Sequence, residues 1–218
     1  IRMDILTIVS ELAGGMLTTI EIFVLTLVFS LPLGLIIAFG RMSKVGIIRN
    51  ITKIYISIMR GTPLMLQLIV VYFGPYYIFG MTISSSYRGT AVIIAFALNY
   101  AAYFGEIYRS GIESMSKEQY EAAKMLGYSS QATFFRIILP QVIKRILPSI
   151  TNEVITLVKD TSLAFSIAYA EMFTQAKALA ATAHNVVPLL AAGLFYYIFN
   201  FVVAMAMDYA EKRMNYYN

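Results

Sequence analysis

Five apolar stretches, each close to the length that a helix needs to cross a lipid bilayer, constrain this chain more than any other feature of its sequence. A membrane-spanning α-helix takes about 20 mainly apolar residues. The stretches run from Met16 to Phe39, from Tyr55 to Phe79, from Thr90 to Tyr108, from Pro140 to Val158 and from Val187 to Met207. The fold class predicted for residues 1–218 is therefore a single all-α integral membrane domain with about five transmembrane helices.

Composition supports a membrane protein and excludes several kinds of site. Of the 218 residues, 59% are hydrophobic and only 13% are charged, against about 25% charged in an ordinary soluble domain. The chain has no cysteine, and His184 is its single histidine. Disulfides, cysteine-bearing metal sites and histidine clusters are therefore excluded, and we predict neither a metal site nor a catalytic site. The first apolar stretch is too long for the core of a cleavable signal peptide, so we interpret it as a span.

The positions of lysine and arginine predict the orientation. An odd number of spans places the two termini on opposite sides of the membrane, and most basic residues share one predicted side. These are Arg41, Lys44, Arg49, Lys53, Arg109, Lys117, Lys124, Arg136, Lys144, Arg145, Lys212 and Arg213. The positive-inside rule then places the N-terminus outside, and the C-terminus and residues 116–140 in the cytoplasm. Because the basic residues are interspersed with spans rather than gathered in one patch, nucleic-acid binding is not predicted.

Residues 116–140 form a moderately polar loop between two strongly apolar stretches, and local signals predict a short helix in its first half. Ser116, followed three residues later by Gln119, matches a capping box at the start of that helix. Gly127 stands where the helix would end with a left-handed residue.

A second short helix is predicted in the other half of the loop. Ser129 or Ser130 can cap it. Pro140 would stop it and, because its missing N–H costs nothing at a first helical position, can open the next span.

The spacing of this loop resembles the EAA loop in the membrane subunits of ATP-binding-cassette (ABC) importers. The matching positions are Glu121, Ala122, Ala123, Gly127, Ile137, Leu139 and Pro140. In that family the loop lies on the cytoplasmic face and docks into a groove of a separate ATPase subunit. The resemblance therefore implies the type I importer permease fold and assigns these seven residues to ATPase coupling. One departure is Glu118, which stands before Gln119 where the family usually has glycine.

Two further segments resemble the polar amino-acid branch of these importers, which includes histidine, glutamine, arginine and cystine permeases. They are RGTPLMLQLIVVYFG from Arg60 and NEVITLVKDTSL from Asn152. The resemblance implies a bacterial cell-membrane permease that forms a dimer with a second copy or a paralogue. It also implies three kinds of partner, which are an ABC ATPase dimer, an extracytoplasmic amino-acid-binding protein and membrane lipid.

No phosphate-binding motif of the GxxxxGK[ST] type occurs in the sequence. The chain is therefore predicted to bind no cofactor and not to be an enzyme by itself, with ATP and Mg on the partner ATPase.

Polar residues within the apolar stretches are the candidates for a substrate pathway. Gly61 and Pro63 predict a break in the second stretch, and such breaks persist in membranes where protein or a watery cavity satisfies the freed backbone groups. The pathway candidates are Gln67, Tyr100, Asn152, Lys159, Asp160, Thr161 and Ser162. For the adjacent charges of Lys159 and Asp160, two interpretations stay open. One is interfacial snorkelling with mutual neutralisation, and the other is a cavity lining suited to a zwitterion.

Three structural expectations complete the sequence analysis. Ser30, Gly34 and Ala38 predict a close helix-packing seam. Glu106 and Arg109 are spaced to pair on one helix. The segment from Ala164 to Asn185 is too polar to span, and we expect an outer-face helix or a re-entrant turn there.

Two other function classes fit the sequence less well. A secondary transporter driven by an ion gradient is the alternative, but such a protein normally shows two related halves, and five spans do not divide into equal repeats. An intramembrane enzyme is disfavoured because neither HExxH nor GxSxG occurs.

Overall fold

The computed structural model describes residues 4–214, and over this range the protein is built of helices and short connections. The long helices are α1 (Ile5–Arg41), α2 (Gly46–Gly61), α3 (Leu64–Phe79), α4 (Tyr87–Glu113), α7 (Leu139–Asp160) and α9 (Val187–Met214). The shorter elements are α5 (Lys117–Met125), α6 (Ser130–Thr133), the π-helical turn η1 (Phe134–Ile138), the 3₁₀ turn η2 (Thr161–Ile167) and α8 (Met172–Ala183). The predicted all-α fold is confirmed for the described residues.

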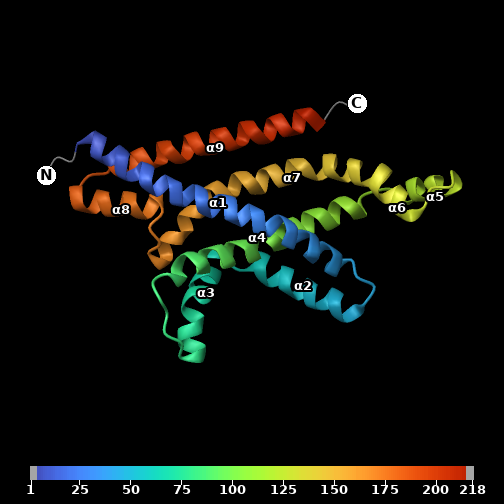
Figure 1. The fold of residues 1–218 in the computed structure, drawn as a ribbon, viewed down its shortest axis with the longest axis horizontal. Helices are drawn as coiled ribbons and strands as arrows, with labels where there is room; N and C mark the ends of the chain where they lie inside the picture. Colours follow the sequence, from blue (N-terminus) through green and yellow to red (C-terminus); the bar gives the residue numbers. More distant parts are fainter. Residues whose placement is uncertain (1–3, 215–218) are drawn as a thin grey trace.

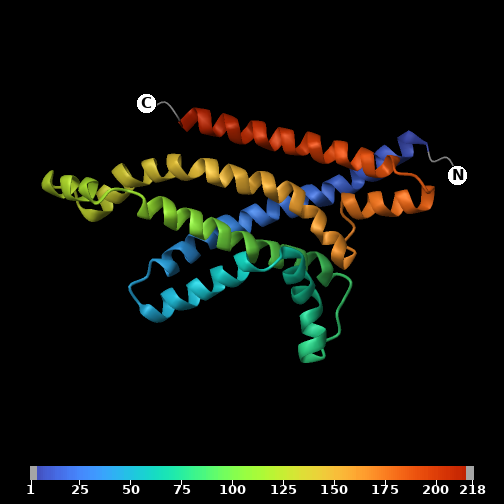
Figure 2. The ribbon, with the colours of Figure 1, turned by 180° about the vertical axis from the view of Figure 1, so that it is seen from behind.

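The long helices share one direction, apart from α3. Figure 1 shows α1, α4, α7 and α9 running lengthwise, whereas α3 leaves the bundle at a steep angle. Helices α5 and α6 project at one end, and α8 lies at the other end beside the beginning of α1. From behind, α7 and α9 run alongside each other (Figure 2). The molecule therefore has two distinct ends, with the 116–140 loop at one of them.

Three helices are long and apolar enough to cross a membrane, namely α1, α4 and α9. Each contains one predicted span and extends beyond it. Helices α2 and α3 would supply a fourth crossing if the bent pair is counted as one span. The stretch predicted as the span Pro140–Val158 is helical, as α7. Helix α7 is not apolar enough to count as a candidate span, however, because five charged side chains are distributed along its 22 residues. The described residues thus give three or four candidate spans where five were predicted.

The second predicted span is not one rod. Helix α2 ends at Gly61 and α3 begins at Leu64. Between the two helices the direction of the helix axis changes by 109°. Thr62 adopts an extended conformation with φ −123° and ψ 149°, as expected of a residue that precedes proline. Pro63 then stands at the N-cap of α3. The break lies at the predicted residues, Gly61 and Pro63, and it divides the stretch from Tyr55 to Phe79 between two helices.

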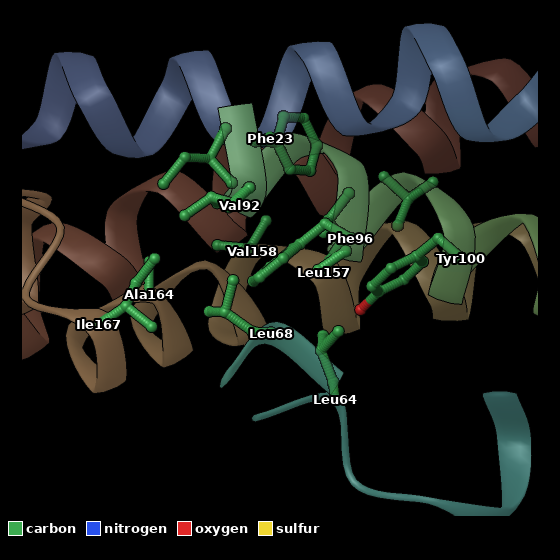
Figure 3. Packing of buried hydrophobic residues seen from close by; sticks show 14 of the residues in the cluster. Phe23, Leu64, Leu68, Val92, Phe96, Tyr100, Leu157, Val158, Ala164 and Ile167 are labelled. Atoms are coloured by element: carbon green, nitrogen blue, oxygen red, sulfur yellow. The ribbon is translucent and has the colours of Figure 1, made fainter. Parts of the chain in front are cut away.

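The core is centred on α4. Phe96, Tyr100 and Phe104 lie on one face of this helix and are at most 2% exposed. Figure 3 shows Phe96 with Phe23 of α1 on one side and Leu68 of α3 on the other. Because α4 is covered by α1, α3 and α7, Asn99 and Tyr100 are buried between helices.

Helices α1 and α4 approach closely at small residues, as the packing seam predicted. Ser30, Gly34 and Ala38 are buried on α1. A Cβ atom at Gly34 would lie 2.8 Å from the Phe104 Cβ, and one at Gly105 would lie 2.7 Å from a side-chain carbon of Ile37. The two glycines therefore permit a backbone contact that any larger residue would prevent.

Candidate functional site

The first half of the 116–140 loop is α5, and its end has the geometry that the sequence predicts. Gly127 has φ +81°, the left-handed region that favours glycine. Its N–H donates to the Lys124 carbonyl at 3.0 Å, and the Tyr128 N–H donates to the Ala123 carbonyl at 3.0 Å. These two bonds form a Schellman motif. The turn fixes the direction in which the chain leaves α5.

The start of α5 differs from the prediction. Ser116 is the N-cap residue, but its side chain makes no capping hydrogen bond. Gln119 exchanges two side-chain hydrogen bonds with Gln141 of α7, at 2.9 and 3.1 Å. The predicted capping box is therefore replaced by a link between α5 and α7. Hydrogen bonds from the Glu118 backbone N–H and from the Ser116 side chain lower the pKa of the Glu118 carboxyl group.

The second half of the loop leads into α7 without a break. Ser129 caps α6 by accepting a hydrogen bond from the Ala132 N–H at 3.2 Å. The π-helical turn η1 follows, and α7 begins with Pro140 in its first turn. Because proline clashes with the carbonyl four residues back, a wider turn at this position is the expected local solution. Pro140 opens α7 as predicted, but it does not stop the second short helix, because α6 ends at Thr133 and the chain stays helical through η1.

The loop presents an exposed apolar surface at the end of the molecule. Met125 is 89% exposed and Leu126 is 77% exposed, whereas Ala123 is 2% exposed. Glu121 and Ala122 are also exposed. The other predicted coupling residues lie at the base, where Ile137 and Leu139 are half-buried and Pro140 is exposed. We call Glu121, Ala122, Met125 and Leu126 the loop surface.

A polar cavity of about 270 Å³ opens where the α2–α3 break faces α4 and α7. The residues from the break are Thr62, Pro63 and Leu64, and the polar lining is completed by Asn99, Tyr100, Tyr103, Glu153, Thr156 and Asp160. The Tyr100 hydroxyl donates to the Asp160 carboxylate at 2.8 Å. Glu153 and Asp160 are seven residues apart on α7 and therefore lie on one face of that helix.

One cation adjoins this cavity. The Arg60 guanidinium lies over the ring of Tyr103, 5.2 Å from its centroid. The lining contains two carboxylates of α7, and Arg60, which is not a lining residue, contacts the lining residue Tyr103. This arrangement can contact both charged groups of a zwitterion.

Gln67 finds its hydrogen-bond partners in the protein, at the α2–α3 break and on α4. Its amide N–H₂ donates to the Met59 carbonyl at 3.0 Å and to the Thr62 hydroxyl at 2.8 Å. Its carbonyl accepts from the Asn99 amide at 2.9 Å, and Asn99 also donates to the Met59 carbonyl at 3.0 Å. The two amides satisfy the backbone groups freed at the break and attach it to α4. Gln67 therefore stabilises the bend and does not line the cavity.

The remaining pathway candidates are dispersed. Lys159 and Ser162 line a separate pocket of about 380 Å³ against α9. Asn152 is exposed, and Thr161 is fully buried with its hydroxyl bonded to the Val158 carbonyl. Of the seven candidates, the structure brings Tyr100 and Asp160 together in the cavity and leaves the other five outside its lining.

Several lining residues, among them Asn99, Tyr103 and Glu153, were not among the candidates. Asn99 is an amide in an apolar stretch, the same signal that singled out Gln67, and the spacing of Glu153 from Asp160 also indicates a shared face. Tyr103 has no comparable signal, because tyrosines near helix ends are common interfacial residues.

The family model of the binding-protein-dependent transport system inner membrane component matches residues 30–216, a range that contains both the loop and the cavity. The chain belongs to this family. It is a permease of the ABC importer type, in a family whose membrane subunits are not catalytic by themselves.

Named relatives are similar over most of the chain. The L-cystine transport system permease protein TcyB of Bacillus subtilis is 37% identical over 94% of this chain and 87% of its own length. The putative glutamine transport system permease protein GlnP of Rickettsia conorii is 34% identical over 92% of this chain and 91% of its own length. The arginine transport system permease protein ArtQ of Bacillus subtilis is 35% identical over 92% of this chain and 90% of its own length.

Solved structures agree with the fold. The crystal structure of an amino acid ABC transporter with histidines matches with a TM-score of 0.86 and 30% identity, over 98% of this chain and 100% of that chain. The inward-facing MetNI methionine ABC transporter matches with a TM-score of 0.73 at 15% identity, over 98% and 100%, which supports the fold alone. The type I importer permease fold is thereby confirmed.

Proposed function

We propose that this protein is the permease subunit of an ATP-driven amino-acid importer in a bacterial cell membrane. Two copies, or this chain and a paralogue, enclose the pathway, and an extracytoplasmic binding protein delivers the substrate. The sequence contains no phosphate-binding loop of the GxxxxGK[ST] type, so a separate ATPase dimer carries ATP and Mg. The relatives named for cystine, glutamine and arginine transport support an amino-acid substrate.

The loop surface is the observation that carries this proposal. Met125 and Leu126 are largely exposed on a helix that projects beyond the bundle, next to an exposed carboxylate at Glu121. Clustered apolar side chains outside the membrane indicate a protein partner. The Schellman turn at Gly127 gives this surface a fixed orientation, so a force on α5 passes through η1 into α7, which lines the cavity.

The polar cavity is the proposed substrate pathway. Asp160 and Glu153 would contact the ammonium group of an amino acid, while Arg60 would contact its carboxylate. Tyr100 holds the Asp160 carboxylate in place through the 2.8 Å hydrogen bond. The cavity interpretation of Asp160 is favoured over snorkelling, because this side chain is directed toward α4 rather than toward the membrane surface.

Two substitutions in the loop test the coupling role. Gly127→Val places a branched side chain at a left-handed residue, which costs roughly 1–2 kcal/mol, and Glu121→Lys reverses the charge on the loop surface. Both variants should insert in the membrane but lose co-purification of the ATPase or substrate-stimulated ATP hydrolysis. The assay is ATPase activity of the purified complex in lipid, with and without binding protein and amino acid.

A matched control is available at the other glycine with positive φ. Gly80 ends α3 with φ +66°, and like Gly127 it has no atom within 4 Å of an added Cβ. Gly80→Val introduces the same backbone strain away from the loop and should keep wild-type ATPase association. Wild-type hydrolysis and uptake in both loop variants would remove the main support for ATPase coupling.

A further inference from the structure

A groove between α1 and α4 joins a polar pocket to an apolar one. The polar pocket, about 380 Å³, is lined by Glu21 of α1, by Ser86 and Thr90 at the start of α4, and by Tyr169. The apolar pocket, about 370 Å³, is lined by Phe29 and Leu33 of α1 and by Ile94 and Ala97 of α4. Because Thr90 and Ile93 line both pockets, the two are continuous. We call this continuous feature the α1–α4 groove.

The polar end of the groove lies at the depth of lipid headgroups. Arg41 ends α1 with a basic residue, which favours a position at one membrane surface. Glu21 is twenty residues earlier, about 30 Å along the helix axis, and this distance equals the thickness of the hydrocarbon core. Leu33 is about 18 Å from Glu21 toward the membrane centre. The groove therefore extends from the opposite headgroup region through about one leaflet.

The chemistry of the polar end selects a positive group. Glu21 is exposed and makes no hydrogen bond or ion pair with any residue between 4 and 214. The hydroxyls of Ser86, Thr90 and Tyr169 line the same pocket, and no lysine or arginine does. A Cβ at Gly89 would lie 2.9 Å from the Tyr169 hydroxyl, so glycine at this position lets that hydroxyl approach the backbone of α4.

We propose that the α1–α4 groove binds a phospholipid with a primary-amine headgroup, phosphatidylethanolamine. The ammonium group has three N–H donors, which match the Glu21 carboxylate and the neighbouring hydroxyl oxygens. A quaternary choline headgroup has no N–H donor and lacks this match. One acyl chain lies against Phe29, Leu33, Ile94 and Ala97, where the lining has no polar surface.

Native mass spectrometry of the full-length permease with its ATPase tests the proposal. The complex is titrated with phosphatidylethanolamine and with phosphatidylcholine of identical acyl chains. The wild type should retain phosphatidylethanolamine roughly two- to fivefold more strongly, the range for one partly exposed ion pair. Glu21→Gln should abolish the preference. Glu11→Gln, an exposed glutamate of α1 outside the groove, should leave it unchanged.

A separate variant tests the apolar half of the α1–α4 groove, and a second copy of the permease is the alternative occupant of that half. Ile94 is 40% exposed, so Ile94→Trp can fill the groove without disturbing the core and should weaken retention of both lipids. The chain has no cysteine, so Ile94→Cys reports contact between two copies. Rapid Ile94→Cys crosslinking between copies in membranes would show that a second permease covers the groove and would overturn the proposal. Equal retention of the two lipids by the wild type would overturn it as well.

Lipid retention is measured without substrate or transport. Its failure is therefore distinguishable from failure of the proposed importer function.

Discussion

At the scale of single residues, Lys159 and Asp160 are adjacent in sequence but serve different surfaces. Asp160 lines the polar cavity and accepts the Tyr100 hydroxyl hydrogen bond, whereas Lys159 lines the pocket against α9. Adjacent residues on a helix are about 100° apart around its axis, so they cannot share one narrow face. No salt bridge joins these two side chains among the described residues.

Substitution of each charge separately tests this distinction. Asp160→Asn removes the negative charge that is proposed to hold the substrate ammonium group, and we expect uptake to fall roughly tenfold or more, the value of a hydrogen bond to a charged group. Lys159→Met should reduce uptake far less. Radiolabelled amino-acid uptake, normalised to the amount of permease in the membrane, measures both. Equal losses in uptake and membrane amount for Asp160→Asn would assign that residue to folding instead.

At the scale of helices, the sequence was sufficient to predict a helix end or break wherever a single residue determines the backbone conformation. Pro63 and Gly127 act through sterics that operate in any surroundings, so the break and the end of α5 could be predicted from the sequence. Gln67 could be identified as needing a partner, but its partner Asn99 lies 32 residues away. The rotation of α7 about its own axis directs Asp160 to the polar cavity and Lys159 to the pocket against α9. This rotation depends on packing between helices, so no local sequence signal predicts it.

The number of spans could not be predicted for a related reason. The hydropathy of a segment reports its average surroundings, and α7 is covered partly by α4 and α9. A helix packed against protein can carry five charged residues, while a helix facing lipid cannot do so without cost. Counting apolar residues therefore predicted a fifth span at α7. By length and apolar composition, α1 qualifies as a candidate span and α7 does not.

The crossing of α1 and α4 makes a prediction at this scale. Gly105→Ala adds a methyl group 2.7 Å from Ile37 and 3.1 Å from the Gly34 carbonyl oxygen. Such overpacking costs about 1–3 kcal/mol, and the purified permease should unfold at a temperature roughly 2–10 °C lower. Gly14→Ala on α1 is the control, because no atom lies within 4 Å of the added Cβ. An unchanged Tm for Gly105→Ala would mean that the helices do not meet at these glycines.

At the scale of the whole molecule, most of the basic residues belong to segments at one end. The turn after α1, the loop that carries α5 and α6, and the end of α9 lie toward the same end of the long axis (Figure 1). The connection from α3 to α4 and helix α8 lie away from that end. The distribution of charge along the chain thus corresponds to a separation in space, which supports the proposed cytoplasmic position of the loop.

Cysteine labelling tests the orientation of the entire molecule. The native chain contains no cysteine, and Ser85 and Ser130 are both exposed, so a single thiol at either position is accessible to reagent. Ser85→Cys should react with a membrane-impermeant maleimide added to intact cells, and Ser130→Cys should react only after permeabilisation. Both variants must label fully in permeabilised cells, because this control separates orientation from burial. Labelling of Ser130→Cys in intact cells would place the loop outside. An ATPase that uses cytoplasmic ATP could then not reach Met125 and Leu126, and the proposed coupling would fail together with the topology.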